Sequence, residues 1–397
     1  MSEVVNIPQL RFPEFNGEWE EKALGVVATI TTGSTPSTSN NEYYDGDVAF
    51  VSPADIQGNR IVRSTKTTIT ELGLSVVREI KKRSTLFVCI GSTIGKVSQA
   101  GVNCATNQQI NALTAKNSFD NDFIYSLLEF KAPRIKLLAG VQAVPQINKS
   151  EFSRFKFTFP LLPEQQKIAA FLTAVDNKIE QLSKKQALLG EYKKGLMQQI
   201  FSQAIRFKAD DGSEFPDWEE KNGNEIFDNI SNKNHDSDLP ILAITQEHGA
   251  IPRDLINYKM IVSDKSVSSY KVVETGDFII SLRSFQGGIE YSNYKGICSP
   301  AYIILRPAIE IEKKFYKYYL KTYRYIQDLN RKLEGIRDGK MVSYKYFSEI
   351  KLPYPSISEQ AKIANFLSSI DNKIEQVGKQ LDESKQFKKA LLQQMFV

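Results

Sequence analysis

Two long segments of this chain repeat each other, and this repeat limits the possible folds more than any other feature. Residues 164–201 read EQQKIAAFLTAVDNKIEQLSKKQALLGEYKKGLMQQIF, and residues 359–396 read EQAKIANFLSSIDNKIEQVGKQLDESKQFKKALLQQMF. The offset is a constant 195 residues without a gap, and about half of the positions are identical. The only two tryptophans, Trp19 and Trp218, stand in similar frames ahead of the two copies. The sequence therefore predicts two half-proteins in tandem, each a globular segment followed by one long helix.

Both copies carry an apolar stripe with alternating spacings of four and three residues, which is typical of a helix with a coiled-coil seam. The stripe of the first copy consists of Ile168, Leu172, Val175, Ile179, Leu182, Leu189, Leu196 and Ile200, with breaks at Gln186 and Lys193. The stripe of the second copy consists of Ile363, Leu367, Ile370, Ile374, Val377, Leu381, Leu391 and Met395, with breaks at Ser384 and Lys388. A helix of about 38 residues is about 57 Å long, which is the length of a spacer.

Prolines predict where the two helices begin. Pro160 and Pro163 stand ahead of the first helix, Pro353 and Pro355 stand ahead of the second, and Ser358 is the expected N-cap of the second. Two such stripes in one chain are expected to pair with each other. Antiparallel pairing places one globular segment at each end and relates the halves by an approximate two-fold axis. Duplex DNA has the same local symmetry. Two DNA-binding segments related in this way would therefore meet two half-sites from equivalent directions.

Composition agrees with an ordinary globular protein. With 397 residues, 41% of them hydrophobic and 24% charged, the chain is long enough for two or three domains. The formal net charge of +5 suits a polyanionic partner, although many proteins without such a partner share it. The three cysteines follow neither a disulfide framework nor a metal-binding spacing. Because the sequence also has no signal peptide and no apolar run of membrane-spanning length, we expect a soluble, cytoplasmic protein.

Short apolar runs bounded by Gly, Ser, Pro or Asp predict buried strands in both globular segments. These runs are residues 50–51, 85–90, 277–282 and 301–305, and helical patterns cover residues 122–138 and 313–333. The expected fold is therefore mixed α/β, with two tandem globular domains and two long helices. The expected bounds are 1–160 for the first domain, 161–203 for the central helix, 204–354 for the second domain and 355–397 for the C-terminal helix.

A motif enters each helix. In the first half it reads Gln146-Ile147-Asn148-Lys149-Ser150-Glu151-Phe152 and then Phe159-Pro160-Leu161-Leu162-Pro163-Glu164-Gln165-Gln166-Lys167-Ile168. The second half has Leu352-Pro353-Tyr354-Pro355 and Glu359-Gln360-Ala361-Lys362-Ile363, with a different upstream part at residues 341–345. Further matching stretches are residues 30–37, 50–56, 91–96 and 107–109. On these motifs the chain resembles, over essentially its whole length, the specificity subunits of type I restriction-modification systems, the HsdS family.

This resemblance implies a DNA-binding specificity subunit with two target-recognition domains. Each domain would read one half of a bipartite site in double-stranded DNA, and the paired helices would hold the two domains apart. The implied partners are two methyltransferase subunits and two ATP-driven restriction subunits. No cofactor is expected in this chain, since S-adenosylmethionine, ATP and Mg are expected on the partner subunits. The alternative from the helix pattern alone is a coiled-coil adaptor without sequence-selective DNA binding.

Candidate DNA contacts are polar and basic residues of the predicted loops. Glutamine amides can pair bidentately with adenine, basic side chains can neutralise phosphates, and the small residues of the loop 91–96 can let backbone amides approach phosphates. The candidates are Ser34, Thr35, Arg60, Lys66, Lys81, Lys82, Ser92, Thr93, Lys96, Gln108, Gln109, Gln142, Arg283, Ser284, Gln286 and Lys340. The alternatives are an ordinary hairpin turn for the loop, amides that satisfy backbone groups, and solvated charge runs. The basic cluster at residues 313–319 is interpreted as a helix that faces the core and keeps its lysines in water.

Polar residues that recur on the outward faces of the two helices are predicted to dock the methyltransferase subunits. These residues are Asn177, Lys178, Glu180, Lys184, Asn372, Lys373 and Glu375. No catalytic residues and no metal site are expected in the chain. Its only histidines are His235 and His248, and the sequence has no HExxH, no GxGxxG and no Asn-Pro-Pro-Tyr type of tetrapeptide. Catalysis is therefore expected to come from partners.

Overall fold

A computed structural model describes residues 6–139, 145–236, 238–256, 267–331 and 342–397. The chain divides into two compact units, unit 1 (1–185 with 377–397) and unit 2 (186–376). Each unit contains one globular domain with part of α5 (Leu162–Phe201) and part of α12 (Ile357–Met395). The predicted mixed α/β fold is confirmed. The predicted domain bounds lie at the helix ends, whereas the two compact units divide both helices along their length.

The two long helices begin close to the prolines that precede them. Pro163 lies in the first turn of α5, where its missing N–H costs no hydrogen bond. Helix α12 begins at Ile357, and Ser356 caps it, because its Oγ accepts a hydrogen bond from the backbone N–H of Glu359 at 3.3 Å. The prediction of Ser358 as the N-cap is therefore wrong, since Ser358 lies inside the helix.

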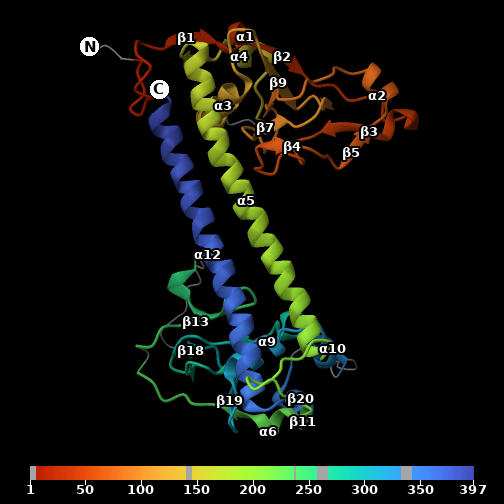
Figure 1. Ribbon diagram of the computed structural model, residues 1–397, viewed down its shortest axis with the longest axis vertical. Coiled ribbons are helices and arrows are strands. Elements are labelled where there is room, and N and C mark those ends of the chain that lie inside the picture. Colours follow the sequence, from red (N-terminus) through yellow and green to blue (C-terminus); the bar gives the residue numbers. More distant parts are fainter. Residues whose placement is uncertain (1–5, 140–144, 237, 257–266, 332–341) are drawn as a thin grey trace. The chain divides into compact units, whose positions relative to one another are not determined.

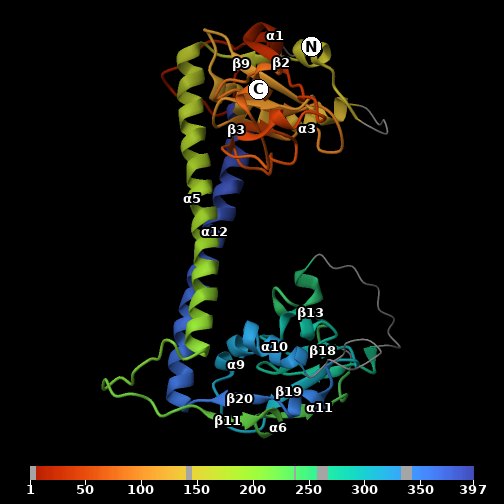
Figure 2. The ribbon, with the colours of Figure 1, turned by 90° about the vertical axis from the view of Figure 1, so that its right-hand side faces the viewer.

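Within each unit, the start of one long helix packs against the end of the other. In unit 1, Ile168 and Leu172 of α5 share a core with Leu391 and Met395 of α12. In unit 2, residues from the end of α5, such as Ile200, share a core with residues from the start of α12. The predicted antiparallel pairing is therefore confirmed, and Figures 1 and 2 show the two helices side by side.

The globular domain of unit 1 contains a five-stranded sheet of order β2-β9-β6-β7-β4 and a three-stranded sheet of order β5-β3-β8. Their strands are β2 (Ala28–Thr32), β3 (Tyr44–Val51), β4 (Ile61–Val62), β5 (Thr67–Ile69), β6 (Thr85–Val88), β7 (Val97–Ala100), β8 (Cys104–Thr106) and β9 (Ile110–Ala115). A two-stranded ribbon of β1 (Glu20–Ala23) and β10 (Lys156–Phe159) precedes α5. The other helices of this domain are α1 (Leu24–Val27), η1 (Asn41–Tyr43), α2 (Glu71–Ser75), α3 (Asn121–Leu138) and α4 (Lys149–Arg154).

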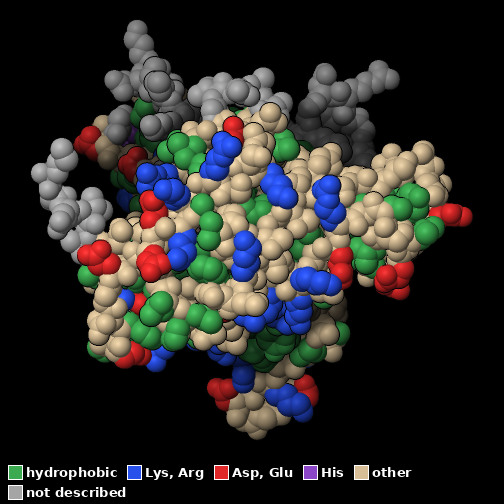
Figure 3. Space-filling model, turned by 90° about the horizontal axis from the view of Figure 1, so that it is seen from above, with side chains coloured by type: hydrophobic (Ala, Val, Ile, Leu, Met, Phe, Trp, Pro, Cys, Tyr) green, Lys and Arg blue, Asp and Glu red, His purple; other side chains and the backbone are tan. Residues whose placement is uncertain are grey.

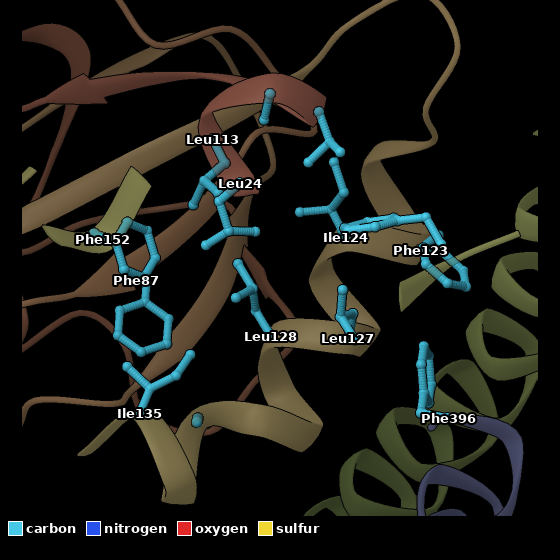
Figure 4. Close-up of a cluster of buried hydrophobic side chains, with 14 of the residues drawn as sticks. Leu24, Phe87, Leu113, Phe123, Ile124, Leu127, Leu128, Ile135, Phe152 and Phe396 are labelled. Atoms are coloured by element: carbon cyan, nitrogen blue, oxygen red, sulfur yellow. The ribbon is translucent and has the colours of Figure 1, made fainter. Parts of the chain in front are cut away.

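The largest core of unit 1 joins the five-stranded sheet, α3 and the helix pair. Figure 4 shows Phe123 of α3 facing Phe396, which follows the last residue of α12, and the two ring centroids are 5.3 Å apart. On the sheet side, Phe87 of β6 packs against Phe152 of α4 with ring centroids 4.9 Å apart. Full burial of each such ring contributes about 1.5 to 3 kcal/mol. These contacts fix the globular domain of unit 1 to the helix pair.

The globular domain of unit 2 contains a four-stranded sheet of order β12-β19-β16-β17. Its strands are β12 (Phe227–Ile230), β16 (Phe278–Ile280), β17 (Glu290–Tyr291) and β19 (Ile303–Pro307). Two-stranded ribbons pair β11 (Glu219–Asn222) with β20 (Lys351–Tyr354), β13 (Leu242–Thr245) with β14 (Gly249–Pro252), and β15 (Lys271–Val273) with β18 (Gly296–Cys298). The short helices are α6 (Gly223–Ile226), η2 (Arg253–Leu255), α8 (Ser284–Gly287), α9 (Lys313–Tyr319), α10 (Tyr323–Arg331) and α11 (Tyr344–Ser348).

The helix predicted over residues 313–333 is interrupted. Helix α9 ends at Tyr319 and α10 begins at Tyr323, and the last two predicted residues lie outside the described ranges. The interpretation of residues 313–319 as a helix that faces the core is confirmed, because Phe315 and Tyr316 are fully buried while Lys313 and Lys314 are exposed. The third lysine, Lys317, is half-buried instead of lying in water.

Candidate nucleic-acid interface

The glutamine of the helix-entry motif ties each long helix to its globular domain in the same way. In unit 1, Gln165 Oε1 accepts the backbone N–H of Asp120 at 3.0 Å, and its Nε2 donates to the carbonyl of Pro160 at 2.8 Å. In unit 2, Gln360 accepts the backbone N–H of Glu312 at 3.0 Å and donates to the carbonyl of Pro355 at 2.8 Å. Both glutamine side chains are buried. The motif therefore fixes how each domain meets its helix.

The glutamate of the same motif binds an arginine from the start of each half. Glu164 accepts Arg11 Nε and Nη2, both at 2.7 Å, and Glu359 accepts Arg206 Nη2 at 3.2 Å. Arg11 and Arg206 are separated by the same 195 residues as the two glutamates. These two arginines were not among the predicted residues, although the constant offset of the repeat identifies them.

Three of the predicted DNA contacts form one polar site on the surface of unit 1. Thr35 Oγ1 donates to Gln108 Oε1 at 2.8 Å, and both side chains are exposed. Ser34 lies beside them, because its backbone N–H donates to the carbonyl of Thr106 at 2.9 Å. Gly33 permits this close approach, since a Cβ there would lie 2.2 Å from the carbonyl oxygen of Asn107. The fold thus brings segments 33–35 and 106–108 into one exposed site.

The loop 91–96 lies in the hairpin connection between the antiparallel strands β6 and β7. Gly91 and Gly95 have φ values of 94° and 89°, which favour glycine. The backbone N–H of Gly91 donates to Pro145 and that of Gly95 donates to Val88. The amides of Gly91 and Gly95 therefore already donate within the protein. Contact of the loop 91–96 with phosphates stays a prediction.

The side chains of the loop 91–96 differ in their exposure to solvent. Ser92 is exposed, whereas Thr93 and Lys96 are half-buried. Lys96 Nζ lies 3.5 Å from the carbonyl oxygen of Pro53. Gln109 is half-buried, and its Oε1 accepts a hydrogen bond from Asn107 at 3.0 Å.

The remaining basic candidates of unit 1 are Lys66 and the neighbouring residues Lys81 and Lys82. Lys66, Lys81 and Lys82 are exposed, and Lys81 pairs with Glu79 at 2.6 Å. In the view of Figure 3, Lys and Arg side chains are dispersed among neutral and hydrophobic groups. Any attraction for phosphates on that face therefore comes from separate charges.

The structure contradicts the prediction that Arg60 contacts DNA. Its side chain is only 7% exposed and lies 4.7 Å from the centroid of the Tyr125 ring. Its guanidinium donates to Gln99 at 2.8 Å, to Asp176 at 2.9 Å and pairs with Asp122 at 3.0 Å. All three guanidinium nitrogens thus have acceptors inside unit 1.

In unit 2, α8 carries the corresponding candidates. Arg283 and Gln286 are exposed, and Gln246 Nε2 donates to the carbonyl of Arg283 at 3.2 Å. Ser284 is 1% exposed, and its Oγ accepts the backbone N–H of Ser281 at 2.9 Å. The prediction of Ser284 as a DNA contact is therefore wrong, because this hydroxyl caps the turn from inside. Gln142 and Lys340 lie outside the described residues.

A cleft of about 630 Å³ lies in unit 2. Its walls come from α5, the turn between β13 and β14, β17, α9 and α10. Glu290, in this wall, is 2% exposed and pairs with Lys321, and burial raises the pKa of its carboxyl. Lys317 also lines the cleft, and burial lowers the pKa of its amino group.

The residues predicted to dock methyltransferase subunits are exposed on the two long helices. Asn177, Lys178, Glu180 and Lys184 lie on the part of α5 in unit 1, and Asn372, Lys373 and Glu375 lie on the part of α12 in unit 2. Glu180 pairs with Arg63 at 2.9 Å, and both side chains remain more than half exposed. Docking at these residues stays a prediction.

Cys89, Cys104 and Cys298 are buried free thiols, and burial raises the pKa of each to about 12. Among the described residues, no group of three or more His, Cys, Asp or Glu is placed to hold a metal ion. Over the same ranges, no helix combines the length and the apolar character that a membrane crossing requires.

The chain is similar to known proteins over nearly its whole length. The family described as the type I restriction modification DNA specificity domain matches residues 16–189 and again residues 216–384. The specificity subunit of the type I restriction enzyme MjaVIII from Methanocaldococcus jannaschii is 25% identical, and the match covers 96% of this chain and 92% of that protein.

Two solved structures share the fold. The S subunit of a type I restriction-modification system from M. genitalium has a TM-score of 0.62 and 18% identity, covering 98% of this chain and 99% of that chain. The second structure was solved in work on complex assembly and conformational transition of the type I R-M system. It has a TM-score of 0.55 and 19% identity, and the match covers 96% of this chain and 97% of that chain. With the family matched twice along the sequence, the chain belongs to the type I restriction-modification DNA specificity family.

Proposed function

We propose that this chain is the DNA-binding specificity subunit of a type I restriction-modification complex. Each globular domain reads one half of a bipartite target, and the paired helices space the two domains. The observation that carries this proposal is the duplication: the family domain occurs twice, and each copy joins its long helix through the same buried glutamine contacts. Two equivalent recognition domains suit two half-sites on duplex DNA.

The exposed polar residues of the two domains differ, which favours two different half-sites. Thr35 and Gln108 in unit 1 supply hydroxyl and amide groups, whereas Arg283 and Gln286 in unit 2 supply a guanidinium and an amide. A glutamine amide suits adenine and an arginine suits guanine in the major groove. We therefore assign base reading to these four residues, and phosphate contacts to Lys66, Lys82 and Lys96.

The proposed subunit is non-catalytic and acts in the cytoplasm. Methylation and cleavage belong to two methyltransferase and two restriction subunits, which hold S-adenosylmethionine, ATP and Mg. The exposed residues that recur on both helices, including Lys178 and Lys373, dock the methyltransferase subunits. Identical polar residues in two copies favour two identical partners. Charge reversal at both lysines together is expected to abolish co-purification with the methyltransferase, and an unaffected complex would rule out this docking site.

The test of the proposed function is genome-wide mapping of methylated adenines in cells that express this chain with its cognate methyltransferase. We expect methylation at one split motif of two short halves around a fixed gap, and loss of that methylation without this chain. Unchanged methylation with an active partner would favour the coiled-coil adaptor and contradict the proposal.

A further inference from the structure

Asp176 of α5 connects three parts of unit 1. Its Oδ1 pairs with Lys388 Nζ of α12 at 2.6 Å, and its Oδ2 accepts Arg60 Nη1 of the globular domain at 2.9 Å. Asp176 and Lys388 are 9% and 11% exposed. Lys388 also donates to Glu129 of α3 at 2.6 Å. One carboxylate therefore holds both helices and the domain together.

Asp371 of α12 makes the same connection in unit 2. Its Oδ1 pairs with Lys193 Nζ of α5 at 2.6 Å, and its Oδ2 accepts the Tyr318 hydroxyl of α9 at 2.7 Å. Lys193 Nζ also lies 4.9 Å from the centroid of the Tyr318 ring. Asp176 and Asp371 are equivalent positions of the repeat, and so are Lys193 and Lys388. Each aspartate thus pairs with the lysine of the other copy.

These reciprocal pairs distinguish antiparallel from parallel helices. With the two copies parallel and in register, Asp176 would lie beside Asp371, and Lys193 beside Lys388. Like charges would then meet at both places, whereas the antiparallel arrangement gives an ion pair at both. Polar residues within an apolar seam are a known means of fixing register and orientation. Lys193 and Lys388 are the two lysines that interrupt the apolar stripes.

The same groups also resist a slip of one helix along the other. A shift by one residue moves a side chain by about 1.5 Å along the axis and rotates it by about 100°. Such a shift would break the aspartate–lysine pair, and it would leave the donor of the globular domain without its carboxylate oxygen. One residue in each unit thus contacts both the opposite helix and the globular domain.

We propose that Asp176 and Asp371, the junction aspartates, are positioning residues that set the gap between the two DNA half-sites. They do so by fixing the register of the helix pair and the position at which each recognition domain packs against the helices. This inference rests on the proposed function, because it concerns the spacing at which the two domains read DNA.

The test exchanges charges at one junction in the full chain, assembled with its methyltransferase subunits. In unit 2, Asp371→Lys alone places two lysines together and Lys193→Asp alone places two carboxylates together, whereas the double variant restores an ion pair. The Tyr318 hydroxyl can accept a hydrogen bond from the new lysine. Methylation rates are compared on the cognate target and on targets with the gap lengthened or shortened by one base pair.

We expect each single variant to lower the preference for the cognate gap by about tenfold, and the double variant to restore it to within about threefold. Asp371→Asn, which keeps the shape and loses the charge, is expected to lower the preference as well. In unit 1, the exchange Asp176→Lys with Lys388→Asp is not expected to restore it, because the new lysine meets Arg60 and the new aspartate meets Glu129.

The matched control is Asp277→Asn, which removes the ion pair between the buried Asp277 and the partly exposed Arg306 inside the domain of unit 2. This variant is expected to lower the stability of the domain and leave the gap preference intact. Folded single variants that keep the wild-type gap preference, or a double variant no better than the singles, would overturn the inference. If the wild-type complex itself shows no gap preference, the proposed function fails instead.

Discussion

Arg11 donates from Nε and Nη2 to the two carboxylate oxygens of Glu164, each at 2.7 Å. The two side chains are 12% and 3% exposed, and Glu164 also accepts Trp19 Nε1 at 3.3 Å. This arrangement satisfies a carboxylate that is almost completely buried at the start of α5. It joins the N-terminal segment to the long helix of unit 1.

Substitution Arg11→Ala is expected to lower the free energy of unfolding by about 3 kcal/mol, because it leaves the buried charge of Glu164 without its partner. Denaturant unfolding followed by circular dichroism measures the loss. The control is Lys167→Ala, since Lys167 and Glu14 form an exposed pair, with side chains 53% and 46% exposed, that should contribute less than about 1 kcal/mol. Equal effects of the two variants would contradict this account of the pair.

Arg60 is expected to support stability without contributing to DNA affinity through charge. Substitution Arg60→Ala leaves Asp122 and Asp176 without their shared partner, and should cost about 3 kcal/mol of stability. The salt dependence of DNA binding by the complex should stay unchanged. Lys66→Ala, at an exposed lysine, is the matched variant and should lower the slope of log affinity against log salt by about 0.9. A lowered slope for Arg60→Ala would show that this arginine does contact a phosphate.

The pH dependence of the stability of unit 1 should reveal the ionisation of the Asp122 carboxyl. Burial opposes its ionisation, but hydrogen bonds from Gln99 and Arg83 and the nearby charges of Arg60 and Arg83 lower the pKa of its carboxyl. A lowered folded-state pKa stabilises the fold above the unfolded value of about 3.9, and this stabilisation is lost as the pH falls. The difference in unfolding free energy between wild type and Asp122→Asn should therefore be constant near pH 7 and shrink in acid. A difference that grows in acid would contradict the assignment.

The three thiols should be unreactive in the folded chain. Burial raises the pKa of Cys89, Cys104 and Cys298 to about 12, so roughly one thiol in ten thousand is ionised at pH 8. A thiol-specific disulfide reagent should label none of the three in the native chain within minutes, and all three in guanidinium chloride. Labelling of any one of them without denaturant would contradict the burial of that thiol.

Much of the architecture was predictable because its signals are local. The 3.5-residue spacing of Ile168, Leu172 and Val175 is set by helix geometry, and the prolines mark the helix starts. Phe315 and Tyr316 follow the helical period, so their burial was predictable too. The break between α9 and α10 was not, since it depends on how residues 320–322 pack.

The roles of individual charges were not predictable, because they depend on partners far away in the sequence. Arg60 stands near Arg63 and Lys66 in a basic stretch, and only the fold brings it against Asp176, more than a hundred residues later. Likewise, Lys193 interrupts an apolar stripe, and its ion pair with Asp371 requires the antiparallel partner. Composition and periodicity carry no information about such pairs.

The central claim is that the two domains read separate halves of one DNA target, and methylome mapping with paired variants tests it most directly. Thr35→Ala with Gln108→Ala alters unit 1, and Arg283→Ala with Gln286→Ala alters unit 2. We expect the first pair to relax or change one half of the methylated motif and the second pair to change only the other half, with the gap preserved in both. Changes in the same half with both pairs, or an unchanged motif with both, would contradict the claim.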